Sequence, residues 1–221
     1  MSSEIKKWWD DDKIRWYIRG AESSDFHQKL ASILSEMVNK SESITELGCG
    51  LGYLTEELSK LGYNITGYDN NSTVIDIASK RCKNAHFGAI DCYTLDTAAD
   101  VSIALFFGKI TEEENLKCLL KSAKKRLIYI TGGGSKRRTS DDEIERTLKN
   151  KMLSYKKTKA ALNFDQPLLD RDEAERYLDA YYRGPIKEEK RKRIEKADSD
   201  EFGYILRNLK DLSIYEIYKE I

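Results

Sequence analysis

The sequence predicts an α/β fold, a three-layer α/β/α sandwich with a mostly parallel sheet between two layers of helices. Three observations lead to this prediction. Short apolar runs alternate with helical patterns from residue 43 to residue 131, a turn with three alternate glycines follows the first apolar run, and two apolar stretches end the chain. Strands that are separated by helices pair in parallel through right-handed crossovers, and helices then cover both faces of the sheet.

The composition is that of one sizeable globular domain. The chain has 221 residues, of which 40% are hydrophobic and 10% aromatic, and this is enough to build a core. Lys plus Arg and Asp plus Glu both number 38, so the formal net charge is zero. This balance argues against a broad electrostatic footprint for DNA or RNA, and we do not expect a nucleic-acid partner.

The sequence also predicts the compartment. No apolar run is long enough to span a bilayer, and the first residues, Met1 to Asp12, lack the apolar core of a signal peptide. The four cysteines, at positions 49, 82, 92 and 118, have neither zinc-ligand spacing nor a C-x-x-C pair. We expect a cytoplasmic protein with reduced thiols, no metal site and no membrane partner. The oligomeric state is not indicated.

Residues 1–40 are predicted to form an N-terminal helical arm or lid. They hold all three tryptophans, and Tyr17 follows the last of them. After Ser24, apolar residues from Phe26 to Val38 recur at three- and four-residue spacing, which predicts a helix against one face of the sheet. Two interpretations of the tryptophans stay open: they pack the arm onto the domain, or they form part of a lid over an active site.

Residues 43–131 supply the predicted parallel sheet. We expect strands over residues 43–48, 63–69, 85–90, 101–107 and 126–131, and helices over residues 53–61, 72–82 and 112–125. The helix ends carry their own signals, because Gly62 is a natural C-terminal stop and Asn71 or Ser72 can cap the second helix. Thr111 and Glu114 form a capping-box pattern for the third helix.

The C-terminal part is predicted to hold a helical insertion, residues 136–200, followed by a β-hairpin, residues 202–219. Two capping-box patterns, beginning at Ser140 and Asp170, open helices in the insertion, which is more polar than the core. Residues 208–211 supply the turn of the hairpin. We expect the insertion to cover the substrate site.

Acidic residues end three of the predicted strands: Glu46, Asp69 and Asp91. A parallel sheet covered on both faces binds its ligand at the carboxyl ends of its strands, near the switch in strand order. The glycines after Glu46 let backbone amides approach a ligand that a Cβ would block. Asp69 is placed to accept hydrogen bonds from two ribose hydroxyls, although it also suits a turn or a helix cap. The pattern therefore predicts a nucleotide-type cofactor site.

These residues resemble the motifs of the class I S-adenosylmethionine-dependent methyltransferases. The stretch Glu46-Leu47-Gly48-Cys49-Gly50-Leu51-Gly52 has the family's acid-x-Gly-x-Gly-x-Gly form, whereas a dinucleotide fingerprint would be Gly-x-Gly-x-x-Gly. Asp69 falls 23 positions after Glu46, and Asp91 falls 22 after Asp69, which fits the family's second and third motifs. The resemblance covers roughly residues 43–131 and, more weakly, residues 202–219.

The resemblance implies a Rossmann-like sheet of seven strands, with residues 202–219 as antiparallel strands six and seven. It implies S-adenosyl-L-methionine as cofactor and S-adenosyl-L-homocysteine as product. The backbone of Gly48, Cys49 and Gly50 would pass under the methionine part of the cofactor. Glu46 would orient this loop or the methionine amino group, and Asp69 would bind the ribose.

Further implied contacts are to the adenine, by Asn70, Asp91 and Cys92, and to the methionine end, by Leu105 and Phe106. The full implied set is Glu46, Gly48, Cys49, Gly50, Gly52, Tyr53, Asp69, Asn70, Asp91, Cys92, Leu105 and Phe106. Two positions depart from the family. Ile90 stands where a small residue is frequent, and Asp100 places the acid of the fourth strand at its start.

The candidates for substrate contacts are Trp9, Trp16, Tyr17, His27 and Phe107. His27 is able to reach a lid-side site, and a surface or packing role is the alternative. Methyl transfer from a sulfonium is an in-line displacement, so alignment and exclusion of water supply much of the catalysis. A base is needed only when the acceptor must lose its proton, and the sequence identifies no catalytic residue.

The predicted function is methyl transfer to an O, N, S or C atom of a small molecule. The only prolines are Pro167 and Pro185, so the Asn/Asp-Pro-Pro-aromatic motif of amino-methylating nucleic-acid enzymes and the Pro-Cys nucleophile of cytosine C5 enzymes are absent. Two alternatives stay open. One is an RNA methyltransferase that uses the basic loop from Gly132 to Arg138, which is otherwise a solvated linker. The other is a non-catalytic cofactor-binding partner subunit.

Overall fold

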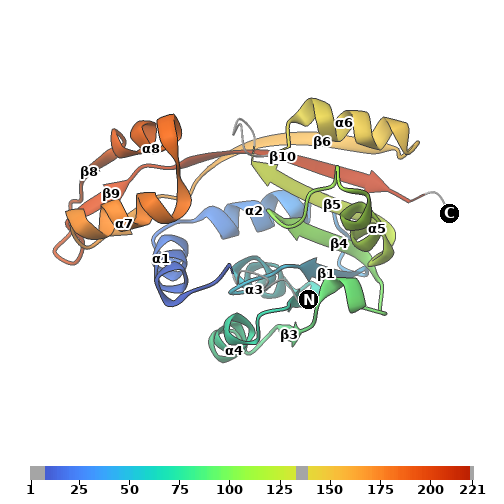
Figure 1. Cartoon of the computed structure of the whole chain (residues 1–221). Helices are drawn as coiled ribbons and strands as arrows, with labels where there is room; N and C mark the ends of the chain where they lie inside the picture. Colours follow the sequence, from blue (N-terminus) through green and yellow to red (C-terminus); the bar gives the residue numbers. More distant parts are fainter. Residues whose placement is uncertain (1–7, 133–138, 220–221) are drawn as a thin grey trace, which may run out of the picture. The chain divides into compact units, whose positions relative to one another are not determined.

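The structure is a computed structural model that describes residues 8–132 and 139–219 (Figure 1). The chain forms two compact units. The larger unit comprises His27–Leu162 and Lys210–Ile221, and the smaller unit comprises Met1–Phe26 and Asn163–Leu209. Each of the predicted segments 1–40, 136–200 and 202–219 is divided between the two units. The assignment of residues 1–221 to one domain stays a prediction.

The larger unit is built on a seven-stranded sheet with the order β3-β2-β1-β4-β5-β10-β6. Its strands are β1 Ser43–Leu47, β2 Asn64–Asp69, β3 His86–Ala89, β4 Ala99–Leu105, β5 Ala123–Gly132, β6 Tyr155–Asn163 and β10 Leu209–Tyr218. β1 pairs in parallel with β2 on one side and with β4 on the other, so the strand order switches at β1. β10 pairs antiparallel with β5. The predicted fold class is confirmed.

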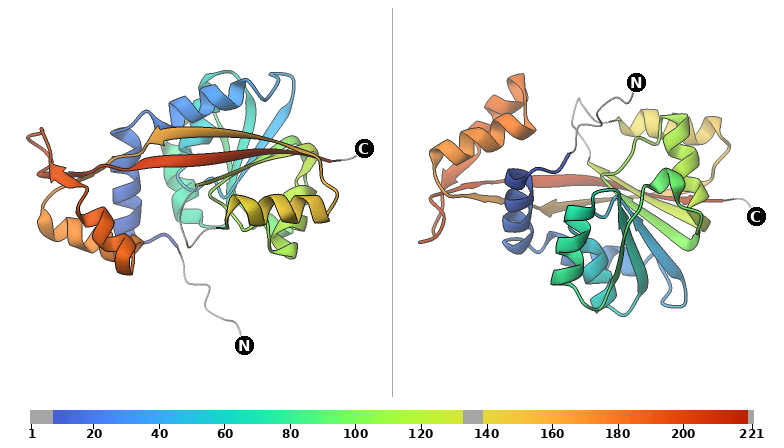
Figure 2. Two further views of the ribbon diagram at one scale, coloured as in Figure 1. Left: turned by 90° about the horizontal axis from the view of Figure 1, so that it is seen from above. Right: turned by 60° about the horizontal axis from the view of Figure 1, so that its bottom comes forward.

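Helices lie on both sides of this sheet (Figure 2). They are α2 Phe26–Ser35, α3 Tyr53–Lys60, α4 Ser72–Arg81, α5 Glu113–Lys121 and α6 Asp141–Asn150, with a short 3-10 helix, η1, at Cys92–Thr94. Asn71 caps α4, because its side chain accepts a hydrogen bond from the Thr73 N–H. The capping box of Ser140 opens α6 as predicted. The capping box predicted at Thr111 is wrong, since α5 starts one residue later and its N-cap residue makes no side-chain cap bond.

A core of apolar side chains packs around β1, β4, β5 and β10. Its fully buried members include Leu47, Ile110, Leu119, Leu127 and Tyr215. Burying one aliphatic side chain of this size contributes roughly 1.5–3 kcal/mol. Because Leu47 is the last residue of β1 and is wholly buried, the core holds in place the strand end from which the glycine turn leaves.

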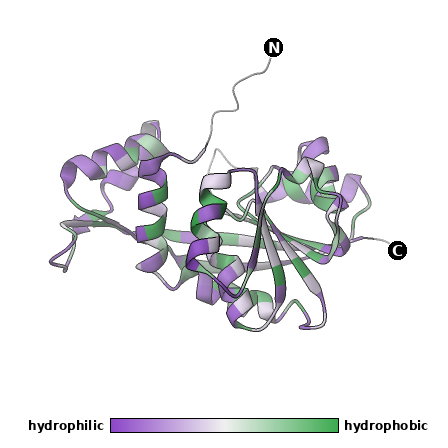
Figure 3. Cartoon of the chain, turned by 90° about the horizontal axis from the view of Figure 1, so that it is seen from below, coloured by the Kyte–Doolittle hydropathy of each residue, from purple (hydrophilic) through white to green (hydrophobic). Residues whose placement is uncertain are grey.

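The smaller unit combines helices with a second, three-stranded sheet of order β7-β9-β8, in which both pairings are antiparallel. Its elements are α1 Asp11–Glu22, β7 Gln166–Leu168, α7 Arg171–Tyr181, α8 Gly184–Arg191, β8 Ile194–Lys196 and β9 Tyr204–Leu206. Figure 3 shows that α7 and α8 are largely hydrophilic; one side of α7 contributes Ala174, Tyr177 and Leu178 to a core, whereas α8 buries no residue. Trp16 lies in that core, 3% exposed, and its indole N–H donates to Glu173 Oε1 at 3.1 Å.

The predicted hairpin over residues 202–219 is wrong. β9 belongs to the sheet of the smaller unit, and β10 lies between β5 and β6 in the larger one. Residues 208–211 do not form a turn, because the Asn208 N–H donates to Asp165 Oδ1 at 2.8 Å and its carbonyl accepts from the Phe164 N–H at 2.9 Å. The chain therefore runs on from one sheet to the other.

The description of residues 136–200 as helical is wrong for β6, β7 and β8. β6 is one of the two edge strands of the larger sheet and contains three lysines in nine residues. Charged side chains on an edge strand oppose pairing with another chain. They also remove the apolar alternation by which a strand is recognised in a sequence, and this explains the error.

Candidate functional site

The glycine turn leaves β1 at the point where the strand order switches. Gly48, Gly50 and Gly52 all have positive φ angles, +67°, +52° and +72°. A residue with a Cβ costs roughly 1–2 kcal/mol in such a conformation. A Cβ on Gly48 would overlap the Phe107 ring, and one on Gly52 would overlap the Phe87 ring. The alternate spacing of the glycines follows from this backbone and from these close approaches.

Asp69, the last residue of β2, binds the glycine turn directly. Its Oδ2 accepts the Gly50 N–H at 3.0 Å, and its Oδ1 accepts the Asn71 N–H at 2.9 Å. The Cys49 N–H also donates to the Tyr68 carbonyl at 2.9 Å, so the turn is linked to β2 at two places. A carboxylate oxygen has two lone pairs, and Asp69 therefore keeps acceptor capacity for a ligand. Asn70 beside it is exposed.

Glu46 lies buried beneath the turn. It is 2% exposed and accepts a hydrogen bond from the Thr55 hydroxyl on α3. Burial raises the pKa of Glu46 to about 7. The same burial, with the charges of Glu46 and Asp69, raises the pKa of the Cys49 thiol well above its usual value, so Cys49 is a neutral side chain and not a nucleophile. Thr55 was missed in the sequence, where one threonine in an amphipathic helix gives no signal.

Three side chains stack beneath the start of α3. The His27 ring stacks on the Tyr53 ring at an interplanar angle of 26°, with centroids 5.4 Å apart, and the Arg81 guanidinium lies 3.7 Å from the centroid of Tyr53. Arg81 Nη2 also donates to the Leu51 carbonyl at 2.8 Å, and Arg81 pairs with Glu56. Arg81 therefore binds both the glycine turn and the helix that follows it, a role that its sequence position did not indicate.

His27 is neutral in this stack. It is 4% exposed, and burial together with the charge of Arg81 lowers its pKa to about 3. These contacts favour the packing interpretation of His27. Its role in substrate binding stays a prediction.

The third predicted acid, Asp91, caps η1, since its Oδ1 accepts the Tyr93 N–H at 3.0 Å. Cys92 follows it, half-buried, and packs against the same core cluster as Phe107. Phe106 has a positive φ of 54° and is 40% exposed. The structure thus brings η1, the end of β4 and the glycine turn together at one edge of the sheet.

Residues 44–127 match the family model described as "Methyltransferase domain". Residues 44–127 are a methyltransferase domain. The predicted resemblance to the class I S-adenosylmethionine-dependent methyltransferases is confirmed over this segment. The matched segment begins at β1 and ends in β5, so it contains the glycine turn and both of the following acids.

Two curated proteins match parts of the chain. Malonyl-acyl-carrier-protein O-methyltransferase of Bacillus cereus is 42% identical over 83 residues, which are 34% of this chain and 31% of that protein. The 23S rRNA (uracil(1939)-C(5))-methyltransferase RlmD of Shewanella piezotolerans is 24% identical over 128 residues, 49% of this chain and 29% of that protein. The chain thus spans just under a third of the length of these curated relatives.

A solved structure resembles the whole chain. Magnesium protoporphyrin IX methyltransferase of Synechocystis, solved with bound S-adenosylhomocysteine, gives a TM-score of 0.58 at 14% identity and covers 100% of this chain and 90% of that one. At this identity the likeness shows the fold. The same protein has also been solved with S-adenosylmethionine.

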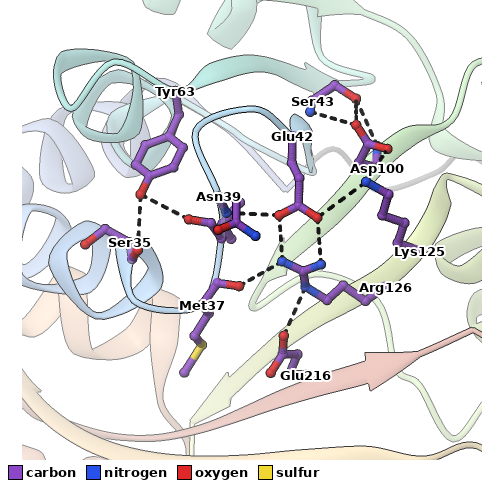
Figure 4. Close-up of polar contacts among 11 residues, drawn as sticks. Ser35, Met37, Asn39, Glu42, Ser43, Tyr63, Asp100, Lys125, Arg126 and Glu216 are labelled. Atoms are coloured by element: carbon purple, nitrogen blue, oxygen red, sulfur yellow. Dashed lines mark hydrogen bonds and ion pairs between the residues drawn. The ribbon is translucent and has the colours of Figure 1, made fainter.

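Asp100, the displaced acid of the fourth strand, lies at the opposite end of the methyltransferase domain, where the strands begin (Figure 4). Its Oδ2 accepts the Ser43 N–H at 3.0 Å and the Ser43 hydroxyl at 2.9 Å, and Lys125 Nζ lies 3.1 Å away. The bonds from Ser43, and then Lys125, lower the pKa of Asp100 to about 2. Asp100 therefore joins β1 to β4 and lies away from the glycine turn.

Of the other predicted substrate residues, Phe107 belongs to the larger unit, and Trp9, Trp16 and Tyr17 belong to the smaller one. Trp9 and Tyr17 meet edge to face with ring centroids 5.5 Å apart, and Trp16 is a core residue. Their substrate role stays a prediction. The basic stretch Lys136–Arg138 lies outside the described residues.

In residues 8–132 and 139–219, no three His, Cys, Asp or Glu side chains are grouped so as to hold a metal ion. Over the same ranges, no helix combines the length and the apolar character needed to cross a membrane.

Proposed function

We propose that this chain is an S-adenosylmethionine-dependent methyltransferase whose acceptor is a small molecule. The observation that carries the proposal is the three-glycine turn at the switch in strand order, with its middle amide bound to Asp69 at the end of β2. A parallel sheet binds its ligand at this point. The family match over residues 44–127 supports the choice of cofactor.

The residues at the turn fit this cofactor. Gly48 leaves the backbone without a Cβ beside Phe107, and Asp69 has lone pairs left for two ribose hydroxyls. Asn70 and Asp91 stand at the next strand ends for the adenine, and Glu46 supports the turn from below. The bound sulfonium supplies an electrophilic methyl group. The chain's own contribution is to align that group with the acceptor and to exclude water.

The small-molecule acceptor is supported by the balanced net charge and by two of the similar proteins. Their names give a porphyrin and a malonyl-acyl-carrier protein as acceptors. We also assign the chain to the cytoplasm. The four free cysteines, which an oxidising compartment would tend to pair, support this assignment.

An RNA acceptor is the second candidate, because a 23S rRNA methyltransferase matches half of the chain. Binding of RNA that weakens steeply with salt, together with methyl transfer to RNA, would favour it. Tight cofactor binding without transfer to any member of a broad acceptor panel would favour a non-catalytic partner subunit.

The first experiment is a calorimetric titration with S-adenosylmethionine and with NAD. We expect binding heat for the sulfonium cofactor only, and the reverse result would overturn the assignment. A screen with labelled cofactor against extracts of metabolites, RNA and protein then identifies the class of acceptor.

Replacing Asp69 tests the ribose contact. Asp69→Ala should weaken binding of S-adenosylhomocysteine by about 2 kcal/mol, because hydrogen bonds to a charged acceptor contribute about this much. The variant should also lose the preference for the ribose form over a 2′-deoxy analogue, which separates ribose binding from support of the turn. Asp96→Ala is the matched control, since the Asp96 side chain is 92% exposed. An unchanged preference in Asp69→Ala would leave Asp69 a turn residue.

A further inference from the structure

Two thiols that come from distant parts of the sequence meet behind the predicted adenine side of the larger unit. The Cys118 thiol of α5 donates a hydrogen bond to the Cys92 sulfur of η1, with the two Sγ atoms 3.2 Å apart. Even two carbon atoms in favourable contact are about 3.5–4.0 Å apart, so this contact is close. A disulfide has its sulfurs about 2.05 Å apart, and closing the bond needs an approach of only about 1 Å.

We propose that Cys92 and Cys118 form a dithiol modification site, which a peroxide oxidises to an intramolecular disulfide. Nothing in the methyl-transfer chemistry uses these thiols. The site therefore goes beyond the proposed function.

The exposure of the two thiols assigns their roles. Cys92 is partly exposed, so it is the thiol that a small oxidant reaches, whereas Cys118 is 8% exposed. The Cys92 sulfur attacks one peroxide oxygen, the O–O bond breaks, and Cys92 sulfenic acid and one water form. The Cys118 sulfur then attacks the sulfenic sulfur and displaces hydroxide, which takes the thiol proton and leaves as the second water. Two thiols lose two electrons in total, and one peroxide accepts them.

The surroundings of the two thiols make their oxidation slow. Burial, followed by the contact with Cys118, holds the pKa of Cys92 well above its usual value, and burial also raises the pKa of Cys118. Thiolates are the reactive form, so both thiols resist mild oxidant at neutral pH, and the rate rises as the pH is raised. Such a pair responds to a strong or sustained oxidant and stays reduced otherwise.

Closing the disulfide affects the segment that the proposed function places beside the adenine. η1 is already joined to α5 by a hydrogen bond from the Tyr93 hydroxyl to Asn115 Oδ1, and Asp91 caps η1 through the Tyr93 N–H. Drawing Cys92 toward α5 moves this cap. On the proposed function, the oxidised protein therefore binds S-adenosylhomocysteine several-fold more weakly, and a thiol reductant restores the affinity.

The test treats the intact protein with hydrogen peroxide and maps its peptides without reduction. We expect one linked pair of peptides, containing Cys92 and Cys118, in the wild type and in the control variant Cys82→Ser. In Cys118→Ser the link is lost and Cys92 is trapped as sulfenic acid by a dimedone probe. Circular dichroism checks that each variant folds.

The absence of a Cys92–Cys118 link, or a link through Cys82 or Cys49 in its place, would overturn the proposed site whether or not the protein binds the cofactor. A linked protein that binds S-adenosylhomocysteine as tightly as the reduced one would overturn the coupling to the adenine side. Failure of the proposed function itself shows differently, as a reduced wild type that binds no cofactor at all.

Discussion

Acidic side chains at the two ends of the strands in the larger sheet have different kinds of partner. Where the strands begin, Arg126 binds both carboxylate oxygens of Glu42, at 2.8 and 2.7 Å, and its Nε lies 3.0 Å from Glu216 (Figure 4). Where the parallel strands end, Asp69 and Asp91 bind backbone N–H groups. There the backbone also adopts positive φ angles.

This difference in partners distinguishes an acid that stabilises the fold from one that is available to a ligand. An acid that faces a bidentate arginine has its charge and lone pairs matched by the protein itself. An acid that accepts only backbone N–H groups keeps its negative charge and spare lone pairs for a ligand. Phe106, at the end of β4, has a positive φ of 54°, and backbone strain of this kind at a residue with a Cβ is often found at functional sites.

The largest expected effect on stability comes from removing the arginine that pairs with the acids where the strands begin. Arg126→Met leaves the side chains of Glu42 and Glu216, 6% and 13% exposed, without their shared cation. We expect the free energy of unfolding, measured in urea, to fall by about 3–5 kcal/mol. Lys125→Met is the control, because its ammonium is half exposed and contributes at most about 1 kcal/mol. Equal losses in the two variants would contradict the comparison, as would a change in cofactor affinity of the folded protein.

The next largest effect is a pH dependence of the free energy of unfolding, which comes from Glu46 at the carboxyl end of β1. The pKa of Glu46 is raised from 4.5 to about 7 in the folded protein, so the folded state holds a proton that the unfolded state has lost between these values. The stability that this proton contributes is complete below the unfolded pKa and is lost as the pH rises through about 7.

Glu46→Gln keeps a neutral acceptor for Thr55 and removes the titration. We expect its unfolding free energy to fall less than that of the wild type between pH 5 and pH 8, by on the order of a few kcal/mol. Urea unfolding at several pH values measures the difference. Parallel stability curves for the two proteins would show that Glu46 does not titrate in this range.

The smallest expected effect is on stability and cofactor affinity when either of two glycines with similar backbone angles is replaced. Gly48 and Gly62 have φ angles of +67° and +85°, but a Cβ on Gly62 meets only Lys40 Nζ, at 3.6 Å, whereas one on Gly48 overlaps Phe107. Alanine at either position should cost about 1–2 kcal/mol of stability from the backbone alone. Only Gly48→Ala should also weaken binding of S-adenosylhomocysteine, measured by calorimetry. A similar loss of affinity in Gly62→Ala would mean that the effect is global.

The sequence predicted those parts of the structure that depend on local pattern. β1, β2 and β4 were placed within a few residues, because each is a short segment rich in strand-forming residues between turn and helix signals. The glycine turn and Asp69 were found together because their spacing follows from one strand-helix-strand unit.

What was missed depends on contacts between distant segments. Arg81 binds Leu51 and stacks on Tyr53 only after α4 has packed beside α3. A single arginine near the end of a helix does not predict these contacts. Cys92 in η1 and Cys118 in α5 are 26 positions apart, and β4 lies between them in the chain, so they meet only after β4 has joined the sheet and α5 has packed against it.

The backbone bond between Phe164 and Asn208 has a consequence for how such a protein changes over time. The chain enters the residues 163–209 and leaves them at two neighbouring points, just beyond the paired strands β6 and β10. A stretch whose ends already lie together can be lengthened, shortened or replaced without altering the order of the seven strands. Changes of length in that stretch can therefore be accommodated while the seven-stranded sheet keeps its order.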